Sequence, residues 1–283
     1  MPTYLKANFQ TVSYLYKKMK LLLAFIFTVC CSVPAAGQQT LLSYQQSYDP
    51  PAMQDLLKWK ETFTYEVNYG FFTLGTVRTT IVRDTTYEGE QLWWLQTKIV
   101  SDPSIPFMGK EINHYNTFFV VTDSLPYTRL YWRDNVDEDE FNAERYDFDY
   151  EAGQVYISND GEPKDTLKLS EPSTSGQLIF YYSRLFAGSE QDYSLPVYLE
   201  GEKGDIDVHN TRNSEIRVYP AFNNPVKTYS SRGDAHIDGP FGFSGKFKAW
   251  FVADNLRIPA EVHAKVWLGN VKVRLIDYKK KRR

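Results

Sequence analysis

Apolar and polar residues alternate most regularly near the C-terminus of the chain. One alternating run spans Glu261–Leu268, and a second resumes at Val271 after Gly269-Asn270. A period of two is typical of half-buried strands, and a Gly-Asn link between two such runs predicts a tight hairpin. With that turn, the predicted cross-strand pairs on the apolar side are Leu268 with Val271, Val266 with Val273, and Ala264 with Leu275.

Shorter strand-like runs, separated by turn-forming residues, fill most of the chain before this hairpin. They predict strands at residues 62–69, 76–83, 91–100, 111–122, 127–133, 141–150, 154–158, 192–200, 205–210, 215–219 and 243–252. We expect residues 220–238 to be rich in loops. Many short strands at this spacing are typical of a sandwich or barrel.

One helix interrupts the predicted strands. Positions i, i+3, i+4 and i+7 are occupied by Leu178, Tyr181, Tyr182 and Leu185. Residues 172–175 offer N-caps and Gly188 fits a stop, so we expect one main helix over about 175–187. The expected fold is mainly β, an antiparallel meander that forms a curved sheet or half-barrel with this helix against it. Two separate β domains, divided near the helix, are the alternative. A short helical turn at 53–59 also fits.

The N-terminus has the pattern of an export signal. A basic stretch at 17–20 precedes an apolar run at 21–29 and small residues at 33–37. The apolar run is shorter than the ~20 residues of a membrane-spanning helix, and no later stretch is long enough. We therefore expect an exported protein, periplasmic or associated with an outer membrane. The expected organisation is a signal peptide at 1–36, with 1–18 upstream of the true start, an extension at 37–60 and a single β-rich domain at 61–283.

Charge and cysteine usage narrow the function classes. The net charge of −3 gives no field that would favour nucleic acid. Both cysteines, Cys30 and Cys31, lie in the signal segment, so the mature chain has no disulfide or thiolate ligand. Neither follows the small residue that a lipoprotein signal needs, and we expect no lipidation.

No motif for catalysis or metal binding stands out. The four histidines, His114, His209, His236 and His263, have no metal-ligand spacing. The acidic run 134–140 lacks the pattern of an EF-hand and predicts a solvated loop. The segment 242–245 falls one position short of a nucleophile elbow. We expect no cofactor, no metal and no catalytic residue, and therefore a protein that is not an enzyme.

The predicted C-terminal strands have a second, basic and aromatic side. The predicted register places Lys265 opposite Arg274, and like charges in that position are unfavourable unless an anion or a third group intervenes. This face could contact anionic lipid headgroups or envelope glycans, or it could be a solvated face with lysine stems over tryptophans. The residues of this basic-aromatic face are Lys246, Lys248, Trp250, Lys265, Trp267, Lys272 and Arg274.

Three segments together resemble a family of bacterial envelope proteins, domain of unknown function 3108. The segments are Trp250–Val262 with Leu268–Val271 and Leu275–Tyr278, Phe63–Val67 with Leu74-Gly75, and Leu178–Leu185. The chain departs from the family at 173–176, where an acidic residue is usual. The resemblance implies a secreted, β-rich protein of unassigned function. The architecture is also similar to that of periplasmic lipoprotein carriers, whose curved sheet and helix enclose an apolar cavity.

The leading hypothesis is a protein that binds an apolar or amphipathic envelope molecule between its sheet and its helix. The side chains expected to line the site are Leu178, Tyr181, Tyr182, Leu185, Val262, Val266 and Val273. The bland variant is that these residues form a filled core. The alternative functions are a structural or interaction protein that docks to an envelope partner, and an envelope hydrolase.

Overall fold

A curved β-sheet dominates the computed structural model, which describes residues 49–104, 111–123, 125–135, 144–171, 173–239, 243–266 and 269–283. Over these residues 15 strands form one sheet in the order β8-β7-β6-β5-β4-β3-β2-β1-β15-β14-β13-β12-β11-β10-β9. All neighbouring pairs in it are antiparallel except β9 with β10. The mainly β, curved-sheet prediction is therefore confirmed.

The strands fall into two series that precede and follow the main helix. The first series is β1 (Trp59–Tyr69), β2 (Phe72–Tyr87), β3 (Glu90–Ser101), β4 (Ile112–Thr122), β5 (Leu125–Asn135), β6 (Glu144–Asp149), β7 (Gln154–Asn159) and β8 (Glu162–Lys168). The second is β9 (Thr174–Ser175), β10 (Tyr193–Leu199), β11 (Glu202–Arg217), β12 (Val226–Gly239), β13 (Phe243–Val252), β14 (Pro259–Val266) and β15 (Gly269–Arg282). The described helices are α2 (Met53–Leu57) and α3 (Ile179–Phe186).

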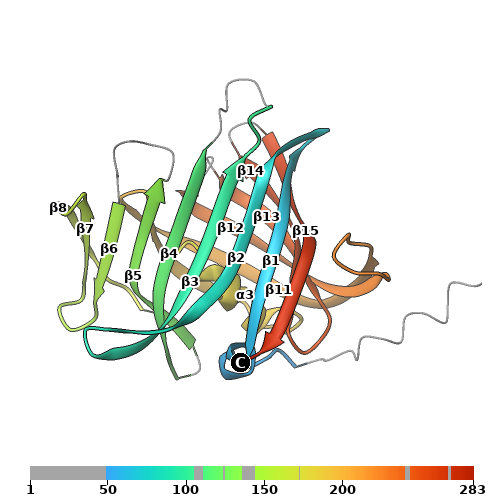
Figure 1. Cartoon of the computed structure of the whole chain (residues 1–283). Helices are drawn as coiled ribbons and strands as arrows, with labels where there is room; N and C mark the ends of the chain where they lie inside the picture. The colour runs from blue at the N-terminus through green and yellow to red at the C-terminus, as the bar shows by residue number, and fades with distance from the viewer. Residues whose placement is uncertain are drawn as a thin grey trace, which may run out of the picture. The chain divides into compact units, whose positions relative to one another are not determined.

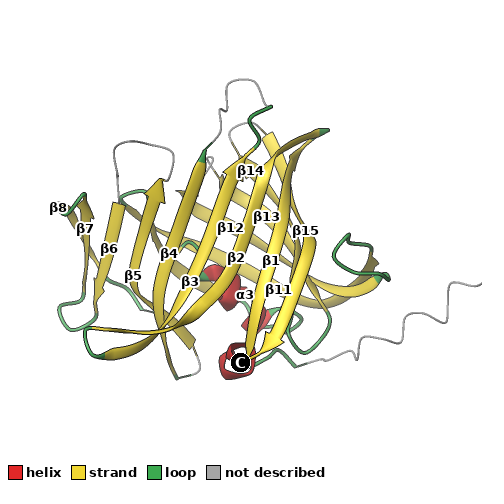
Figure 2. Cartoon of the chain, viewed as in Figure 1, coloured by secondary structure: helices red, strands yellow, loops and turns green. Residues whose placement is uncertain are grey.

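The first and last strands join the two series into one sheet. β1 pairs with β15 from Trp59 opposite Arg282 to Asn68 opposite Lys272. The sheet then curls so that its two series face each other, with α3 between them (Figures 1 and 2). Aromatic residues of β4–β6 pack against apolar residues of β10–β12 in one core cluster. The edge strands β8 and β9 do not pair with each other, so the sheet is not closed into a barrel.

Hydrogen bonds hold β9 across the opening of the curled sheet. The Ser175 backbone N–H donates to Thr128 Oγ1 over 3.0 Å, and the Ser175 and Thr117 hydroxyls lie 2.9 Å apart. Thr128 belongs to β5 and Thr117 to β4. All these groups are buried, so the polar residues just before α3 are satisfied by the strands they face.

Three parts of the predicted element map are wrong. The strands predicted at 205–210 and 215–219 belong to one strand, β11 (Glu202–Arg217), which has an irregularity between Asn210 and Ser214. The segment expected to be loop-rich contains β12, which pairs on both sides. Its polar residues obscure the alternation, yet Thr228 and Ser231 are buried between neighbouring strands. Edge strand β8 is almost wholly exposed, so it carries no hydrophobic period that could have predicted it.

The register of the C-terminal hairpin also differs from the prediction. Val266 pairs with Gly269, and Ala264 pairs with Val271, so Gly269-Asn270 begins β15 and is not the turn. Gly269 instead allows close packing, because a Cβ there would lie 3.1 Å from Tyr69 Cε2. A hairpin's partners can shift by an even number without moving any side chain to the other face. The predicted faces of β14 and β15 therefore survive the wrong register.

Residues 1–48, which include the predicted signal peptide, and the aromatic-face residue Trp267 lie outside the described residues. The short helical turn predicted near residue 53 is present as α2, whose Met53, Leu56 and Leu57 are buried. No helix among the described residues is long and apolar enough to cross a membrane.

Candidate binding cavity

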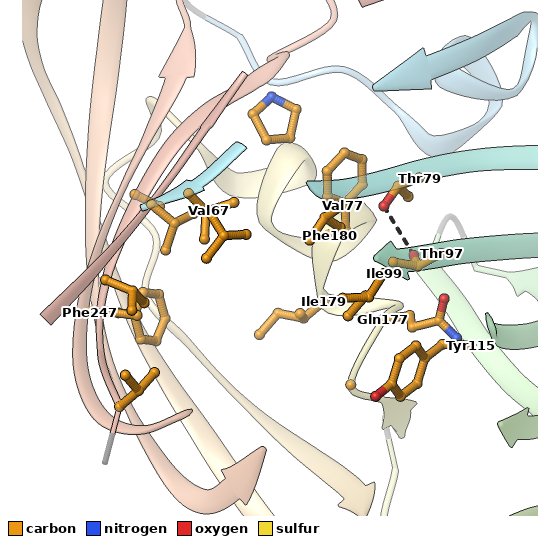
Figure 3. A pocket seen from close by; sticks show the side chains of 18 of the residues that line it. Val67, Val77, Thr79, Thr97, Ile99, Tyr115, Gln177, Ile179, Phe180 and Phe247 are labelled. Atoms are coloured by element: carbon orange, nitrogen blue, oxygen red, sulfur yellow. Dashed lines mark hydrogen bonds between the residues drawn. The ribbon is translucent and has the colours of Figure 1, made fainter. Parts of the chain in front are cut away.

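A cavity of about 580 Å³ lies between the two series of strands. Figure 3 shows Val67 and Phe247 on one side of it, Thr79, Thr97, Ile99 and Tyr115 on the other, and Ile179 between them. The side formed by β13–β15 is lined by Phe247, Ala249, Phe251, Pro259, Val262, Ala264, Val266, Val271 and Val273. This lining is almost entirely apolar because the inward residues of these strands alternate with their outward lysines.

The C-terminal strands line the cavity as their pattern predicted. Val262, Val266 and Val273 all belong to its wall. Val262 lies directly opposite Val273 in the β14–β15 ladder, and Val266 lies at the end of that ladder. The apolar face of this hairpin is therefore a cavity wall, with small and β-branched side chains that leave space in front of them.

The helix lines the cavity with residues other than the predicted ones. Leu178 and Tyr181 are buried in the main core cluster, and Leu185 packs against it. Tyr182 is buried with its ring 6.3 Å from that of Tyr193. The helix side chains that line the cavity are Ile179, Phe180 and Ser183.

The helical periodicity identified the more densely packed side of α3. Six of its eight residues are apolar or aromatic, because the helix lies inside the curl, with one side against the core and another against the cavity. A periodic pattern cannot tell which buried side meets a packed core and which meets a void. The sequence held one signal for the side of the helix that faces the cavity: Phe180 is a large aromatic residue outside the predicted apolar stripe of the helix.

A few polar groups interrupt the apolar wall near the start of α3. The Thr79 and Thr97 hydroxyls lie 3.0 Å apart, and Gln177 Nε2 donates to Thr117 Oγ1 over 3.0 Å. Gln177 Oε1 is buried and has no hydrogen-bond partner among the described residues. An unsatisfied buried carbonyl is costly, so this oxygen is a position where a ligand's donor group would be stabilised.

The titratable groups of the cavity wall are mainly tyrosines. Burial raises the pKa of Tyr115 and, more strongly, that of Tyr131, so both hydroxyls stay neutral at physiological pH. Among the described residues of the wall, Glu111 is the single carboxylate, and it is exposed to solvent. The interior therefore offers apolar surface and neutral hydrogen-bonding groups.

A buried ion pair holds α3 against β1. Arg184 donates to both carboxylate oxygens of Glu61 on β1, over 2.8 and 3.0 Å, and to the Leu256 carbonyl over 2.9 Å. Tyr278 on β15 donates to Glu61 Oε1 over 2.7 Å. Arg184 is fully buried and Glu61 is 2% exposed. Burial and the Glu61 charge raise the pKa of Tyr278, which keeps the donating hydroxyl protonated.

The segment that carries the family resemblance forms a corner against the end of α3. Asp254 Oδ1 accepts hydrogen bonds from the backbone N–H groups of Leu256 and Arg257, over 3.0 and 2.8 Å. The Arg257 guanidinium donates to the carbonyl of Ala187, the C-cap of α3, over 2.8 Å. The segment therefore forms the corner between β13 and β14 and ties that corner to the helix.

The predicted basic-aromatic face divides into two parts. In the first part, around Trp250, the tryptophan is buried, and the Arg217 guanidinium lies 4.2 Å from its ring centroid. Arg217 also pairs with Glu261 over 2.9 Å, and Lys248 pairs with Glu215 over 3.5 Å. Trp250 Nε1 donates to Glu215 Oε1.

The corrected register removes the predicted contact between like charges. Arg274 lies opposite Glu261, and Lys265 lies opposite Asn270. Lys248 and Trp250 share the Glu215 carboxylate, whereas Arg274 donates to the Val218 carbonyl. The second part of the face consists of Lys246, Lys265 and Lys272. These three lysines are exposed, and none of them forms an ion pair with a described residue.

The four histidines lie on four different strands, β4, β11, β12 and β14. His209 pairs with Asp192, and His236 lies 3.1 Å from Asp207, both on the exposed surface. His263 contacts Glu261 over 2.5 Å on the outer face of β14. No group of three or more potential metal ligands exists among the described residues.

Sequence reasoning missed two features that lie next to the cavity lining. The first is the Arg184–Glu61 pair, whose signal was a lone arginine within the apolar helix IFYYSRLF. The second is Phe71-Phe72 directly after Gly70, where a turn between strands normally has polar residues.

Comparison with known proteins gives a family and a distant structural likeness. A family model described as "Protein of unknown function (DUF3108)" matches residues 64–276. A solved structure, described as a beta-barrel-like protein of domain of unknown function DUF1849 from Brucella abortus, covers 79% of this chain and 98% of that chain. It is 10% identical, with a TM-score of 0.49. No curated protein matches the chain.

Proposed function

This chain belongs to the DUF3108 family, whose function is unknown, and we propose from its cavity that it is an exported, non-enzymatic protein that binds an apolar or amphipathic molecule. The observation that carries the proposal is the cavity of about 580 Å³ with its apolar wall. Ligand sites commonly have volumes of roughly 300–1,000 Å³ and apolar linings with few polar groups.

The distribution of polar groups supports a ligand with an apolar body. One wall consists of valine, alanine and phenylalanine side chains from β13–β15. Hydrogen-bonding groups gather on the opposite wall, where Gln177 Oε1 lacks a partner among the described residues. A ligand with one donor group and a hydrocarbon portion would satisfy both walls.

Export is proposed from the N-terminal sequence alone. The basic stretch, apolar run and small residues of 1–36 are the pattern of a secretory signal. Because such a protein folds outside the cytoplasm, its ligand would be a molecule of the cell envelope, such as a lipid.

The direct test is to recover the ligand from the protein. The mature chain, purified from the envelope without detergent exchange, would be examined by native mass spectrometry and then by lipid extraction. We expect an adduct of one amphipathic molecule per chain that is lost after extraction. A protein crosslink together with an empty lipid extract would favour the interaction-protein alternative instead.

A cavity-filling variant tests whether the cavity is the site. Ala264 lines the cavity, so Ala264→Phe places a ring inside it, whereas Lys265→Phe places the same ring on the outer face. Binding would be followed with the fluorescent apolar probe N-phenyl-1-naphthylamine. We expect Ala264→Phe to weaken binding about tenfold or more, and Lys265→Phe to change it less than about twofold.

Thermal unfolding would first establish that wild type and Ala264→Phe are both folded. Equal probe binding by the two would then contradict the proposed site. A third variant, Val266→Phe, enters the cavity from another position and guards against misfolding of the first. If both filled variants bind the probe normally, the cavity is not the binding site.

A further inference from the structure

The turn between β1 and β2 exposes three aromatic side chains. Phe71 is 104% exposed, Phe72 is 60% exposed and Tyr69 is 36% exposed, with only Gly70 among them. Aromatic surface in water is unfavourable, and a cluster of it on a turn marks a contact site more often than single exposed residues do.

This aromatic tip lies at the rim of the cavity. Val67 just before the tip and Leu74 just after it both line the cavity. The Tyr69 ring packs against Gly269, at the start of β15. Exposed Glu111 also belongs to the lining, whereas α3 closes the other end, so the cavity meets solvent on the side of the tip.

Three exposed lysines flank the tip on the outer face of β13–β15. Lys272 lies opposite Asn68, two residues before Gly70. Lys265 lies opposite Asn270, the next-but-one residue before Lys272, and Lys246 lies on the neighbouring strand β13. None of the three forms an ion pair with a described residue, although Asp234 lies opposite Lys246.

Carboxylates occupy the other flank of the rim. Asp102 and Glu111 lie at the ends of β3 and β4, where the Asp102 backbone N–H donates to the Leu74 carbonyl over 2.8 Å. Among the described residues of the rim the charge is therefore asymmetric, with the lysines gathered on the β13–β15 side of the aromatic tip. An anionic surface would be attracted to that side.

We propose that this rim docks onto an anionic lipid bilayer, with Phe71 and Phe72 inserted at the interface and Lys246, Lys265 and Lys272 against the headgroups. Aromatic side chains favour the membrane interface, and each lysine near an anionic leaflet contributes attraction that salt screens. The cavity mouth then faces the acyl-chain region. Its use as the loading point for a ligand rests on the proposed function, whereas docking itself does not.

A bilayer fits these observations better than a protein partner. The exposed surface is a narrow tip of adjacent aromatic residues, and the charges beside it are flexible lysines. A stable protein interface normally buries about 800 Å² on each partner, with shape complementarity around a central pocket. Insertion of a small aromatic tip with nearby cations needs no such surface.

The test is co-sedimentation of the mature chain with vesicles of phosphatidylcholine alone or with 30% phosphatidylglycerol added (roughly the anionic fraction that gives a negative surface potential). We expect binding to the anionic vesicles that weakens as salt is raised from about 0.05 to 0.5 M, because screening shortens the range of attraction. Phe71→Ser/Phe72→Ser should lower the partition coefficient about tenfold or more. Lys265→Gln/Lys272→Gln should lower it about tenfold or more, since each lysine contributes about fivefold.

Matched variants elsewhere on the surface serve as controls. Lys60→Gln/Lys281→Gln removes two exposed lysines that lie opposite each other at the far end of the β1–β15 ladder. Tyr156→Ser/Val218→Ser removes two other exposed apolar side chains, which are 41% and 61% exposed. Both controls should bind vesicles within about twofold of wild type.

The outcomes separate docking from ligand binding. Failure of wild type to sediment with anionic vesicles, or normal sedimentation of Phe71→Ser/Phe72→Ser, overturns the docking proposal. Crosslinking of the tip to a protein, with no vesicle binding, also overturns it. Vesicle binding without binding of N-phenyl-1-naphthylamine leaves docking standing and contradicts the proposed function. A tip variant that binds the probe normally yet no longer sediments supports docking specifically.

Discussion

The two ends of the cavity are built in opposite ways. At the helix end, Arg184 and Glu61 are buried and bonded to each other, and Tyr278 completes the carboxylate's partners. At the rim, Phe71 and Phe72 are exposed, and Lys265 and Lys272 have no ion pair with a described residue. One end satisfies its polar groups internally, whereas the other leaves apolar and charged groups to water.

This difference separates stability from interaction. A buried charge that loses its partner is strongly destabilising, so the helix end should tolerate little change. Exposed side chains away from packed contacts contribute little to the free energy of unfolding, so the rim should tolerate change well. Four predictions test this contrast, in order of decreasing effect on stability.

Arg184→Met should have the largest effect, because it leaves the Glu61 carboxylate buried without a counter-charge. We expect the free energy of unfolding to fall by about 3–5 kcal/mol in urea titrations. Arg145→Met is the matched control, since its ion pair with Asp147 is 40% and 38% exposed, and it should cost about 0–1 kcal/mol. Arg184→Met/Glu61→Met should recover much of the loss. Similar losses for Arg184→Met and Arg145→Met would contradict the role of the buried pair.

Gly188→Ala should have the next largest effect. Gly188 follows α3 with φ of +78°, and a Cβ there would lie 2.4 Å from Tyr229 Cδ2. A left-handed conformation costs a non-glycine residue about 1–2 kcal/mol, and overpacking adds about 1–3 kcal/mol. Gly153→Ala is the control, because its φ is +67° but its Cβ would meet open space. Urea unfolding should show the larger loss for Gly188→Ala; equal losses would mean that the ring contact does not matter.

Glu261→Gln tests how much the ion pairs on the outer face of β14 stabilise the fold, through the pH dependence of stability. Burial favours the neutral carboxyl, but hydrogen bonds and charges from His263 and Arg217 outweigh it and hold the pKa of Glu261 below its ordinary value. Its stabilising contribution is therefore present above the unfolded-state pKa of about 4.3 and is lost as pH falls through the lower folded-state pKa. At pH 7 the variant should be about 1–2 kcal/mol less stable than wild type.

The same urea titrations repeated at pH 3–4 should show a smaller gap between Glu261→Gln and wild type. Glu190→Gln provides the control, because the Glu190 side chain is 72% exposed and its partner Arg212 lies 4.0 Å away. Its difference from wild type should stay near zero at every pH. A Glu261→Gln gap that does not change with pH would contradict a charge-dependent role.

Phe71→Ser/Phe72→Ser should have the smallest effect on stability. Both side chains are exposed, so their removal should change the free energy of unfolding by less than about 0.5 kcal/mol. The measurement is urea unfolding of the same preparation that is used for vesicle binding. A loss comparable to that of Gly188→Ala would show that the tip packs against the protein and would erase the contrast between the ends.

Local sequence patterns predicted much of the cavity wall formed by the C-terminal strands, but little of the two ends of the cavity. The alternation over 261–275 identified which residues face inward, because a strand's period of two survives an even shift in register. It placed the turn at Gly269-Asn270, since nothing local reveals that Gly269 packs under Tyr69. The helix stripe was real, yet it marked the core side of α3, and Phe180 lines the cavity.

The sequence by itself determined the β-rich class, the family and the inward face of the C-terminal strands, because these depend on periodicities over a few residues. Tertiary structure decided that Glu61 meets Arg184 and that Phe71 lies at a rim beside Lys272, because these contacts join residues far apart in the chain. Tertiary structure also decided that the inward faces enclose space. A cavity is the volume that side chains from opposite walls leave unfilled, and that volume depends on how far the sheet curls.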